Sequence, residues 1–233
     1  MAVNDSALQA DGKILLVGAV KEPFRDADQP NTDLLVTRLA SDGMFDPRFD
    51  GDGIVRISIG AGFESGRAVS VLANGKILNA GVVGATYRDQ DTDLFLIRLN
   101  PDGSLDTSFD GDGIVTTHVG TDNNLFDMTV LSDGRIVVAG SVRSSTSGSP
   151  HFLAVRYNAD GSLDTTFDGD GIVETSFVGL GYNEAEAYSL AVQADGRLIL
   201  AGRAQLVRMA VARYNTDGSL DTTFDGDGLA TVA

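Results

Sequence analysis

The sequence predicts an all-β fold assembled from four tandem repeats. Its 233 residues include 28 glycines but only five prolines, a composition typical of many tight turns rather than long helices. Apolar residues make up 42% of the chain, which is enough to bury a core, so general disorder is not expected. Two sequence markers recur four times each, and they define the repeat.

The first marker is an apolar run that follows an Asp-Gly or Asn-Gly pair, as in Asp133-Gly-Arg-Ile-Val-Val-Ala-Gly140. Its copies occupy residues 11–18, 74–81, 133–140 and 195–202. The second marker is a longer acidic turn, whose copies occupy residues 40–54, 100–114, 158–172 and 215–229. The glycine of its Asp-Gly pair is Gly43, Gly103, Gly161 or Gly218, giving spacings of 60, 58 and 57 residues. Four copies of two markers indicate an internal repeat.

Each repeat contains four strand-like runs, called A to D in chain order. Strand A alternates, as where Met128 and Val130 flank Thr129, and strand B is the apolar run of the first marker. Strand C precedes the acidic turn, as at residues 94–97, and strand D follows it, as at residues 114–118. Short strands bounded by Asp/Asn-Gly turns are typical of antiparallel hairpins. Strands B and C are apolar on both faces, so we expect neighbouring sheets to cover both.

Four-stranded units bury both faces when they stack around an axis, which is the arrangement of a β-propeller. We therefore predict one domain over residues 1–233, a β-propeller of four four-stranded antiparallel blades. The predicted blades are residues 1–60, 61–120, 121–178 and 179–233. Alternatives are half of an eight-bladed ring formed by a dimer, a fragment of a larger propeller, and a β-solenoid, whose repeats are usually shorter.

The repeat also resembles a known family. The run from Asp133 to Gly140, followed by Arg156-Tyr-Asn-Ala-Asp-Gly-Ser-Leu-Asp-Thr-Thr-Phe167, resembles the delta-60 repeat of bacterial proteins and, more distantly, propeller blades of the NHL type. The resemblance covers nearly the whole chain. It implies a propeller-like fold and an extracellular or cell-surface location. It implies no defined activity and no catalytic residues.

The predicted loops fall into two sets. Because antiparallel strands alternate in direction, the A–B and C–D turns lie at one end of each blade, and the B–C and D–A loops lie at the other. The first set is nearly identical in all four repeats, whereas the second differs in length and sequence. Binding residues tend to lie on such variable loops, so we expect a ligand there. The candidate ligand-binding residues are Phe24, Arg25, Phe63, Tyr87, Arg88, Asn123, Asn124, His151, Tyr182 and Glu184.

Each acidic turn carries four aspartates within eleven residues, a density of oxygen atoms that suits Ca²⁺. However, aspartate before glycine is also an ordinary turn residue, and the spacing does not match an EF-hand loop. Both interpretations stay open. The candidate metal ligands are Asp50, Asp52, Asp106, Asp110, Asp112, Asp164, Asp168, Asp170, Asp221, Asp225 and Asp227.

An arginine ends strand C in every repeat, just before the acidic turn. These residues are Arg38, Arg98, Arg156 and Arg213. A buried guanidinium needs a charged partner, and a carboxylate that accepts two hydrogen bonds is the natural one. We predict an Arg–Asp pair within or between blades in each repeat.

Composition restricts the partners and the chemistry. A net charge of −16 disfavours nucleic acid, which binds clustered Lys and Arg. No apolar run is long enough for membrane insertion, and no signal peptide is recognised at the N-terminus. The absence of Cys excludes disulfides and thiolate chemistry. The two histidines, His118 and His151, have no metal-ligand spacing, and no hydrolase or phosphate-binding motif occurs.

Three functions fit these observations. The first is a non-catalytic binding or scaffold module that presents its variable loops to a glycan, peptide or protein. The second is an extracellular structural domain stabilised by Ca²⁺. The third is a propeller hydrolase whose acidic site has no recognised motif. A homo-oligomer is compatible with all three.

Overall fold

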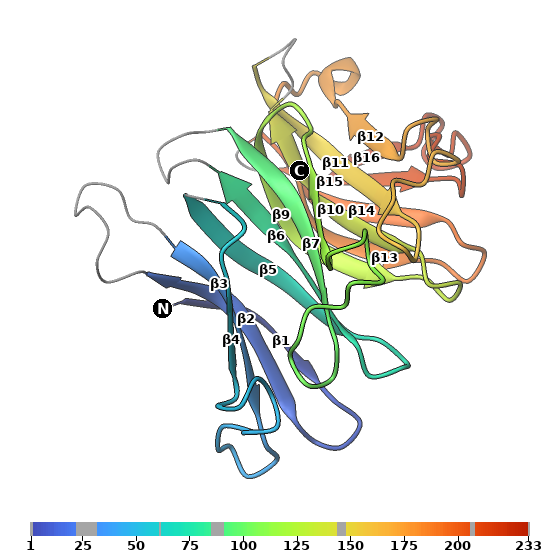
Figure 1. Cartoon of the computed structure of the whole chain (residues 1–233). Coiled ribbons are helices and arrows are strands. Elements are labelled where there is room, and N and C mark those ends of the chain that lie inside the picture. The colour runs from blue at the N-terminus through green and yellow to red at the C-terminus, as the bar shows by residue number, and fades with distance from the viewer. Residues whose placement is uncertain are drawn as a thin grey trace. The chain divides into compact units, whose positions relative to one another are not determined.

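The computed structural model describes residues 2–21, 32–60, 62–84, 91–143, 148–205 and 208–232 (Figure 1). The chain divides into two compact units, unit 1 at residues 1–119 and unit 2 at residues 120–233. In this part of the chain, no helix has the length and hydropathy needed to cross a membrane. Each unit contains two repeats, and each repeat forms four strands as the sequence predicts.

The strands follow one another in the same order in every repeat. Unit 1 contains β1 (Ala2–Leu8), β2 (Ile14–Lys21), β3 (Thr32–Leu39), β4 (Ile54–Ile57), β5 (Phe63–Val71), β6 (Ile77–Gly84), β7 (Thr92–Leu99) and β8 (Ile114–Thr117). Unit 2 contains β9 (Thr121–Val130), β10 (Ile136–Arg143), β11 (Pro150–Tyr157), β12 (Ile172–Thr175), the 3-10 helix η1 (Val178–Leu180), β13 (Ala185–Val192), β14 (Leu198–Ala204), β15 (Arg208–Tyr214) and β16 (Leu229–Val232).

Consecutive strands within each repeat pair antiparallel. In unit 2 the two repeats form two separate four-stranded sheets, as predicted. In unit 1 they do not: Thr32 pairs in parallel with Phe63, and this bridge joins both repeats into one mixed sheet of eight strands. The Thr32–Phe63 bridge exists because β5 already begins at Phe63, a residue that the sequence places in a loop. Its first residue lies beside the start of β3, where the Thr32 hydroxyl donates to the Glu64 carbonyl at 2.9 Å.

The first strand of the second repeat in each unit packs over three strands of the repeat before it. Strand β5 contacts β1, β2 and β3, and β13 contacts β9, β10 and β11. One hydrogen bond recurs at both junctions: Asp5 accepts from the Val69 N–H at 2.9 Å, and Asp127 accepts from the Leu190 N–H at 2.8 Å. The two junctions are therefore built alike.

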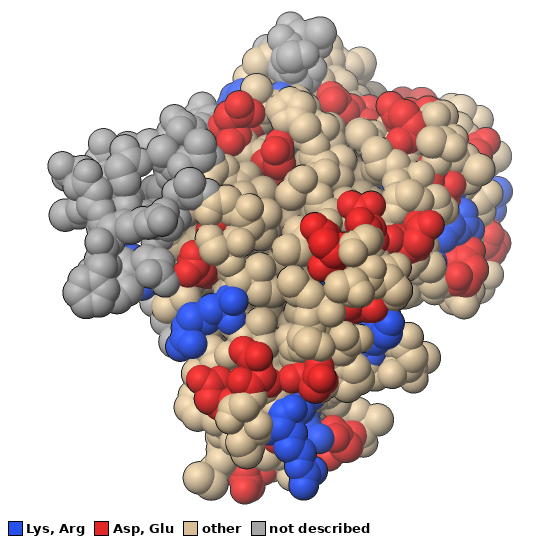
Figure 2. Space-filling view, viewed as in Figure 1, with Lys and Arg blue, Asp and Glu red and all other residues tan. Residues whose placement is uncertain are grey.

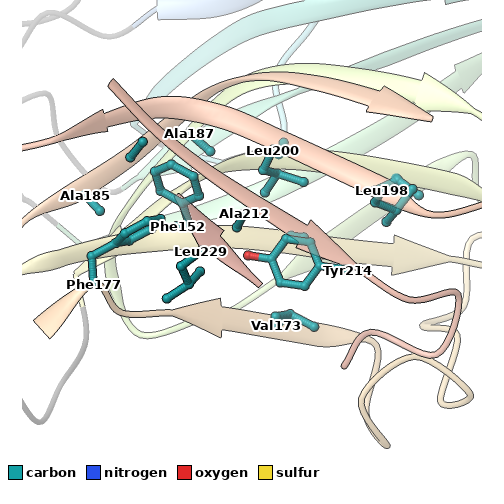
Figure 3. Packing of buried hydrophobic residues seen from close by; sticks show 14 of the residues in the cluster. Phe152, Val173, Phe177, Ala185, Ala187, Leu198, Leu200, Ala212, Tyr214 and Leu229 are labelled. Carbon is teal, nitrogen blue, oxygen red and sulfur yellow. The ribbon is translucent and has the colours of Figure 1, made fainter. Parts of the chain in front are cut away.

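The core of each unit lies between its two repeats. In unit 2, Phe152, Phe177 and Tyr214 are fully buried and belong to one apolar cluster with Leu198 and Leu200 (Figure 3). Burying such side chains contributes about 1.5–3 kcal/mol each. Residues at alternate strand positions point to opposite faces of a sheet, and in each unit one of these faces lies against the other repeat.

A buried amide lies in the core of unit 1. Asn79 has no exposed surface, and neither its amide nitrogen nor its oxygen has a hydrogen-bond partner among the described residues. The same repeat position is occupied by Leu16, Val138 and Leu200. An unsatisfied buried amide costs about 1–3 kcal/mol, so the fold favours an apolar side chain here.

We expect Asn79→Leu to stabilise unit 1 by about 2 kcal/mol, because it removes the desolvated amide and keeps the volume. A urea titration followed by circular dichroism measures the gain. Asn79→Ala is the control, since it removes the amide but leaves a cavity, and it should gain less or lose stability. A lower unfolding midpoint for Asn79→Leu than for the wild type would contradict this account.

Candidate functional site

Every repeat has two chemically different ends. The A–B and C–D turns form the constant end, where the four repeats carry nearly the same side chains. The start of strand A and the start of strand C form the variable end. Equivalent positions there hold Asp33, Asp93, His151 and Arg208 on strand C, and Glu64, Asn123 and Ala185 on strand A.

The Arg–Asp pair predicted in each repeat is confirmed at the constant end. The Nε–Oδ2 distances are 2.9 Å for Arg38–Asp46, 2.5 Å for Arg98–Asp106, 2.7 Å for Arg156–Asp164 and 2.7 Å for Arg213–Asp221. Each guanidinium also lies over a phenylalanine ring of its own turn, at 4.4–4.8 Å from the centroid. Pairing and stacking together compensate the cost of burying the charge.

The remaining turn aspartates have structural partners of their own. Asp102 and Asp112 each accept a backbone N–H two residues further on, and Asp110 has a positive φ of 49°, as turn aspartates do. Burial alone would raise the pKa of Asp106, but hydrogen bonds from Lys76 and Ser108 outweigh it and hold that pKa well below its ordinary range.

The metal interpretation gains no support from these contacts. Within the described ranges, no group of three or more His, Asp or Glu side chains is arranged to hold a metal ion. Figure 2 shows carboxylates in separate groups on one face of the molecule, several of them beside Lys or Arg. Ca²⁺ binding stays a prediction, and the hydrogen bonds of the turn are explained without it.

The candidate ligand residues are distributed over the variable end. Phe24, Arg25, Tyr87 and Arg88 lie outside the described residues. Phe63, Asn123 and Asn124 were expected in loops, but they lie within β5 and β9. The reason is that the A strands continue further along their B-strand partners than the alternation pattern indicates.

The other predicted residues of this end belong to unit 2. Tyr182 and Glu184 lie in the segment before β13, and the Arg208 guanidinium lies 5.5 Å from the centroid of the Tyr182 ring. His151 is buried in β11, 3.9 Å from Glu174. The other histidine, His118, is exposed and lies 2.7 Å from Asp93.

Unit 1 places a buried carboxyl group at its variable end. Glu64 has no exposed surface, and its Oε1 accepts the N–H groups of Gly60 at 2.8 Å and Ile59 at 3.2 Å. Burial, together with the nearby negative charge of Asp33, raises the pKa of Glu64 to about 7. Because the group is fully enclosed, it does not meet a substrate in this structure.

An exposed aromatic pair is the feature of unit 2 that the sequence interpretation missed. The rings of Phe126 on β9 and Tyr188 on β13 meet edge to face, with centroids 5.0 Å apart. They are 38% and 41% exposed. Both residues lie at β-bulges, because each is skipped in the pairing register of its strand. A bulge turns a side chain away from the regular sheet face.

Charged groups adjoin this pair. The Tyr188 hydroxyl donates to Glu186 at 2.6 Å, and Glu186 accepts from Arg203 at 3.0 Å. Partial burial and the bond to Glu186 raise the pKa of Tyr188 to about 12, so it keeps its proton. Burial opposes ionisation of Glu186, but the bonds from Arg203 and Tyr188 outweigh it and lower that pKa. The result is an exposed apolar surface bordered by fixed donors and acceptors.

The signal for this pair was present in the repeat itself. The equivalent positions in the four repeats hold Asn4, Arg67, Phe126 and Tyr188. Aligning the repeats on their B strands marks this as a variable position inside an otherwise regular strand. A comparison restricted to the loops does not include this position, because it lies inside strand A.

Taken together, the repeats, their antiparallel sheets and their packing define an all-β repeat protein of the propeller type. The profile of the family described as "Domain of unknown function (DUF5122) beta-propeller" matches residues 9–49, 72–109, 131–167 and 193–224. The chain belongs to this family, with one matching segment in each repeat. Membership of a β-propeller family is thus confirmed, whereas the resemblance to the delta-60 repeat and to NHL-type blades stays a prediction. No curated protein matches the chain significantly.

Solved structures of similar fold include longer enzymes. A gluconolactonase from Xanthomonas campestris is 16% identical, with a TM-score of 0.45, and 94% of this chain matches 60% of it. An α-L-arabinanase from Penicillium chrysogenum, complexed with arabinobiose, is 10% identical with a TM-score of 0.53, over 97% of this chain and 64% of that one. A family PL25 ulvan lyase is 11% identical with a TM-score of 0.50, over 97% and 56%. The chain thus spans less than two thirds of each, and the likeness concerns the fold alone.

Proposed function

We propose that the four repeats are propeller blades and that the protein is a non-catalytic binding module for a glycan. The observation that carries this proposal is the exposed Phe126–Tyr188 pair beside the Glu186–Arg203 ion pair. Aromatic rings that are apolar on one side and polar at the edge are enriched at binding surfaces. A few fixed polar groups around an apolar surface then give orientation and specificity.

The chemistry of the surface suits a sugar ring. A sugar presents C–H groups on its faces and hydroxyl groups around its rim. The two aromatic rings offer the apolar contact, while the Glu186 carboxylate accepts hydrogen bonds and the Arg203 guanidinium donates them. Peptide and protein ligands are the alternatives from the sequence. The extracellular location implied by the resemblance fits a glycan ligand and is part of the proposal.

The separation of the two ends also supports a binding role. The constant end repeats one set of contacts, which stabilise the fold. The variable end differs in each repeat, so its side chains are not required by a shared packing arrangement. Such divergence on a constant scaffold is typical of recognition surfaces.

We expect a glycan array to give binding that depends on the aromatic pair. Phe126→Ala or Tyr188→Ala should lower the affinity for the glycan found on the array by about tenfold or more. Isothermal titration calorimetry measures this change in affinity. Tyr188→Phe tests the hydroxyl group alone. Val192→Ala is the matched control, because Val192 is also exposed on β13 and lies at its far end. The proposal is refuted if no glycan on the array binds, or if both alanine variants bind the glycan as tightly as the wild type. Binding of peptides but not of glycans would favour the peptide alternative.

A further inference from the structure

The ion pair beside the aromatic pair is peculiar to the fourth repeat. Glu186 on β13 and Arg203 on β14 are direct cross-strand partners. The same cross-strand position of the other repeats holds uncharged side chains: Ala2 with Ala19, Ser65 with Val82, and Asn124 with Ser141. The fold thus accepts small or uncharged side chains here, and the ion pair is not part of the scaffold that the repeats share.

The geometry of this pair places an acceptor beside donors. Arg203 Nε donates to Glu186 Oε2 at 3.2 Å, and Nη2 donates to Oε1 at 3.0 Å, which is the two-point contact that fixes both groups in one plane. Oε2 also accepts from the Tyr188 hydroxyl at 2.6 Å, whereas Oε1 accepts only the bond from Nη2 among the described residues. Arg203 Nη1 makes no bond within the same part of the chain. A ligand therefore meets the free acceptor capacity of Oε1 next to the remaining N–H groups of the guanidinium.

A second ion pair of unit 2 lies near the first. Arg143 at the end of β10 bonds Asp122 at 3.1 Å. Burial opposes ionisation of Glu186, but its hydrogen bonds and the positive charges of Arg203 and Arg143 outweigh burial and lower the pKa of this carboxyl group. Each of the two guanidinium groups near Glu186 thus already holds a carboxylate.

Negative charge exceeds positive charge around these two pairs. The hydrogen bond to Glu186 is the largest cause that raises the pKa of Arg203, and the charge of Glu184 adds to it, so a further carboxylate lies nearby. A carboxylate or sulfate group of a ligand would have to displace Glu186 or Asp122 from its arginine, and it would then face the displaced charge. A hydroxyl group binds without displacing either carboxylate.

We propose that this surface selects uncharged glycans and that the Glu186–Arg203 pair binds two neighbouring hydroxyl groups of one sugar ring. One hydroxyl donates to Glu186 Oε1, and its neighbour accepts from Arg203 Nη2, while the C–H groups of the ring contact Phe126 or Tyr188. Neighbouring hydroxyl oxygens of a sugar are separated by about the same distance as Oε1 and Nη2. This specificity rests on the proposed function, because it requires the glycan to bind at the aromatic pair.

Wild-type protein tests the selection without any substitution. The probes on the array are 1,4-linked cello-, manno- and galactotetraose, each beside the same tetrasaccharide oxidised at C6 to uronates. Oxidation adds negative charge and leaves the ring hydroxyl groups in place. We expect the uncharged form to bind about tenfold or more tightly than its oxidised counterpart, as measured by isothermal titration calorimetry. Equal or tighter binding of the oxidised form would overturn the proposal.

Glu186→Gln should reverse the selection. The amide keeps the size of the side chain but no longer neutralises Arg203, so the guanidinium becomes available to a uronate. We expect the uncharged tetrasaccharide to bind about tenfold more weakly than to the wild type and the oxidised one about tenfold more tightly. Arg203→Gln removes the donors and should weaken the uncharged tetrasaccharide with no gain for the oxidised one. If Glu186 only supported the local structure, its substitution would weaken both tetrasaccharides alike.

The matched control is Asp195→Asn. Asp195 pairs with Arg197 at 2.5 Å in the turn that joins β13 and β14, so the variant breaks another ion pair of the same hairpin at the constant end. Both affinities should stay unchanged, and far-UV circular dichroism checks that each variant is folded.

The outcomes separate this specificity from the proposed function. If Phe126→Ala abolishes binding while Glu186→Gln and Arg203→Gln bind both tetrasaccharides as the wild type does, the glycan site stands and the role of the ion pair is wrong. If only the oxidised tetrasaccharides bind to the wild type, the glycan site again stands and the selection of uncharged glycans is wrong. If no glycan on the array binds, both are wrong.

Discussion

Replacing Arg156 with methionine should lower the free energy of unfolding of unit 2 by about 1.5–3 kcal/mol, because the change removes a buried, charged hydrogen-bond donor from Asp164 and leaves only Arg135, at 3.0 Å, as the cation beside that carboxylate among the described residues. The Arg156 side chain is 3% exposed. Its guanidinium bonds Asp164 at 2.7 Å and the Thr216 carbonyl at 2.6 Å and lies 4.4 Å from the centroid of the Phe167 ring. One side chain thus joins two repeats.

Urea unfolding followed by far-UV circular dichroism measures this loss, which is convenient in a chain without tryptophan. Arg213→Met is the matched control: its pair with Asp221 has the same length, but the side chain is more exposed and, among the described residues, makes no hydrogen bond to another repeat, so the cost should be smaller. The double variant Arg156→Met with Asp164→Asn should lose less stability than the sum of the two single variants, because the two side chains contact each other. Equal costs at both arginines would contradict the argument.

Most of the fold could be predicted because the repeat encodes its own turns. The Asp-Gly pairs and the apolar runs determine where strands begin and end, and four copies of each pattern average out local ambiguity. The Arg–Asp pair was predictable for the same reason. An arginine that recurs at the end of an apolar strand needs a carboxylate partner in every repeat. The aspartates of the acidic turn follow the arginine directly and recur with it.

The candidate site was less predictable. Phe126 and Tyr188 become exposed through β-bulges, and a bulge is a change of register that no periodicity of single residues reveals. Glu64 belongs to β5, but the polar residues at the start of this strand give no clear strand pattern. The contacts that join repeats, such as the one from Asp5 to Val69, connect positions 64 residues apart, and no local pattern specifies them.

The second large effect concerns Glu64, whose carboxyl group should make unit 1 less stable as the pH rises. In the folded state its pKa is about 7, compared with an ordinary value of 4.5. Between these two values the folded state binds more protons than the unfolded state, so the free energy of unfolding decreases with increasing pH. A difference of about 2.5 units corresponds to about 3 kcal/mol, fully lost above pH 7.

Glu64→Gln should remove this dependence. The amide oxygen can still accept from Gly60 and Ile59, and the amide nitrogen replaces Oε2, which has no partner among the described residues. An amide is also what the equivalent position of unit 2 carries, in Asn123. We therefore expect the variant to match the wild type near pH 4.5 and to exceed it by about 3 kcal/mol at pH 8, as measured by urea unfolding at each pH.

The control variant separates burial from charge. Asp33→Asn removes the neighbouring negative charge but leaves Glu64 enclosed, and burial is the larger cause of the raised pKa. This variant should therefore shift the pH at which stability falls only partway back toward 4.5. If Asp33→Asn abolished the pH dependence completely, repulsion rather than burial would control Glu64; if Glu64→Gln were destabilising at pH 8, the carboxylate would have a partner that stabilises its ionised form.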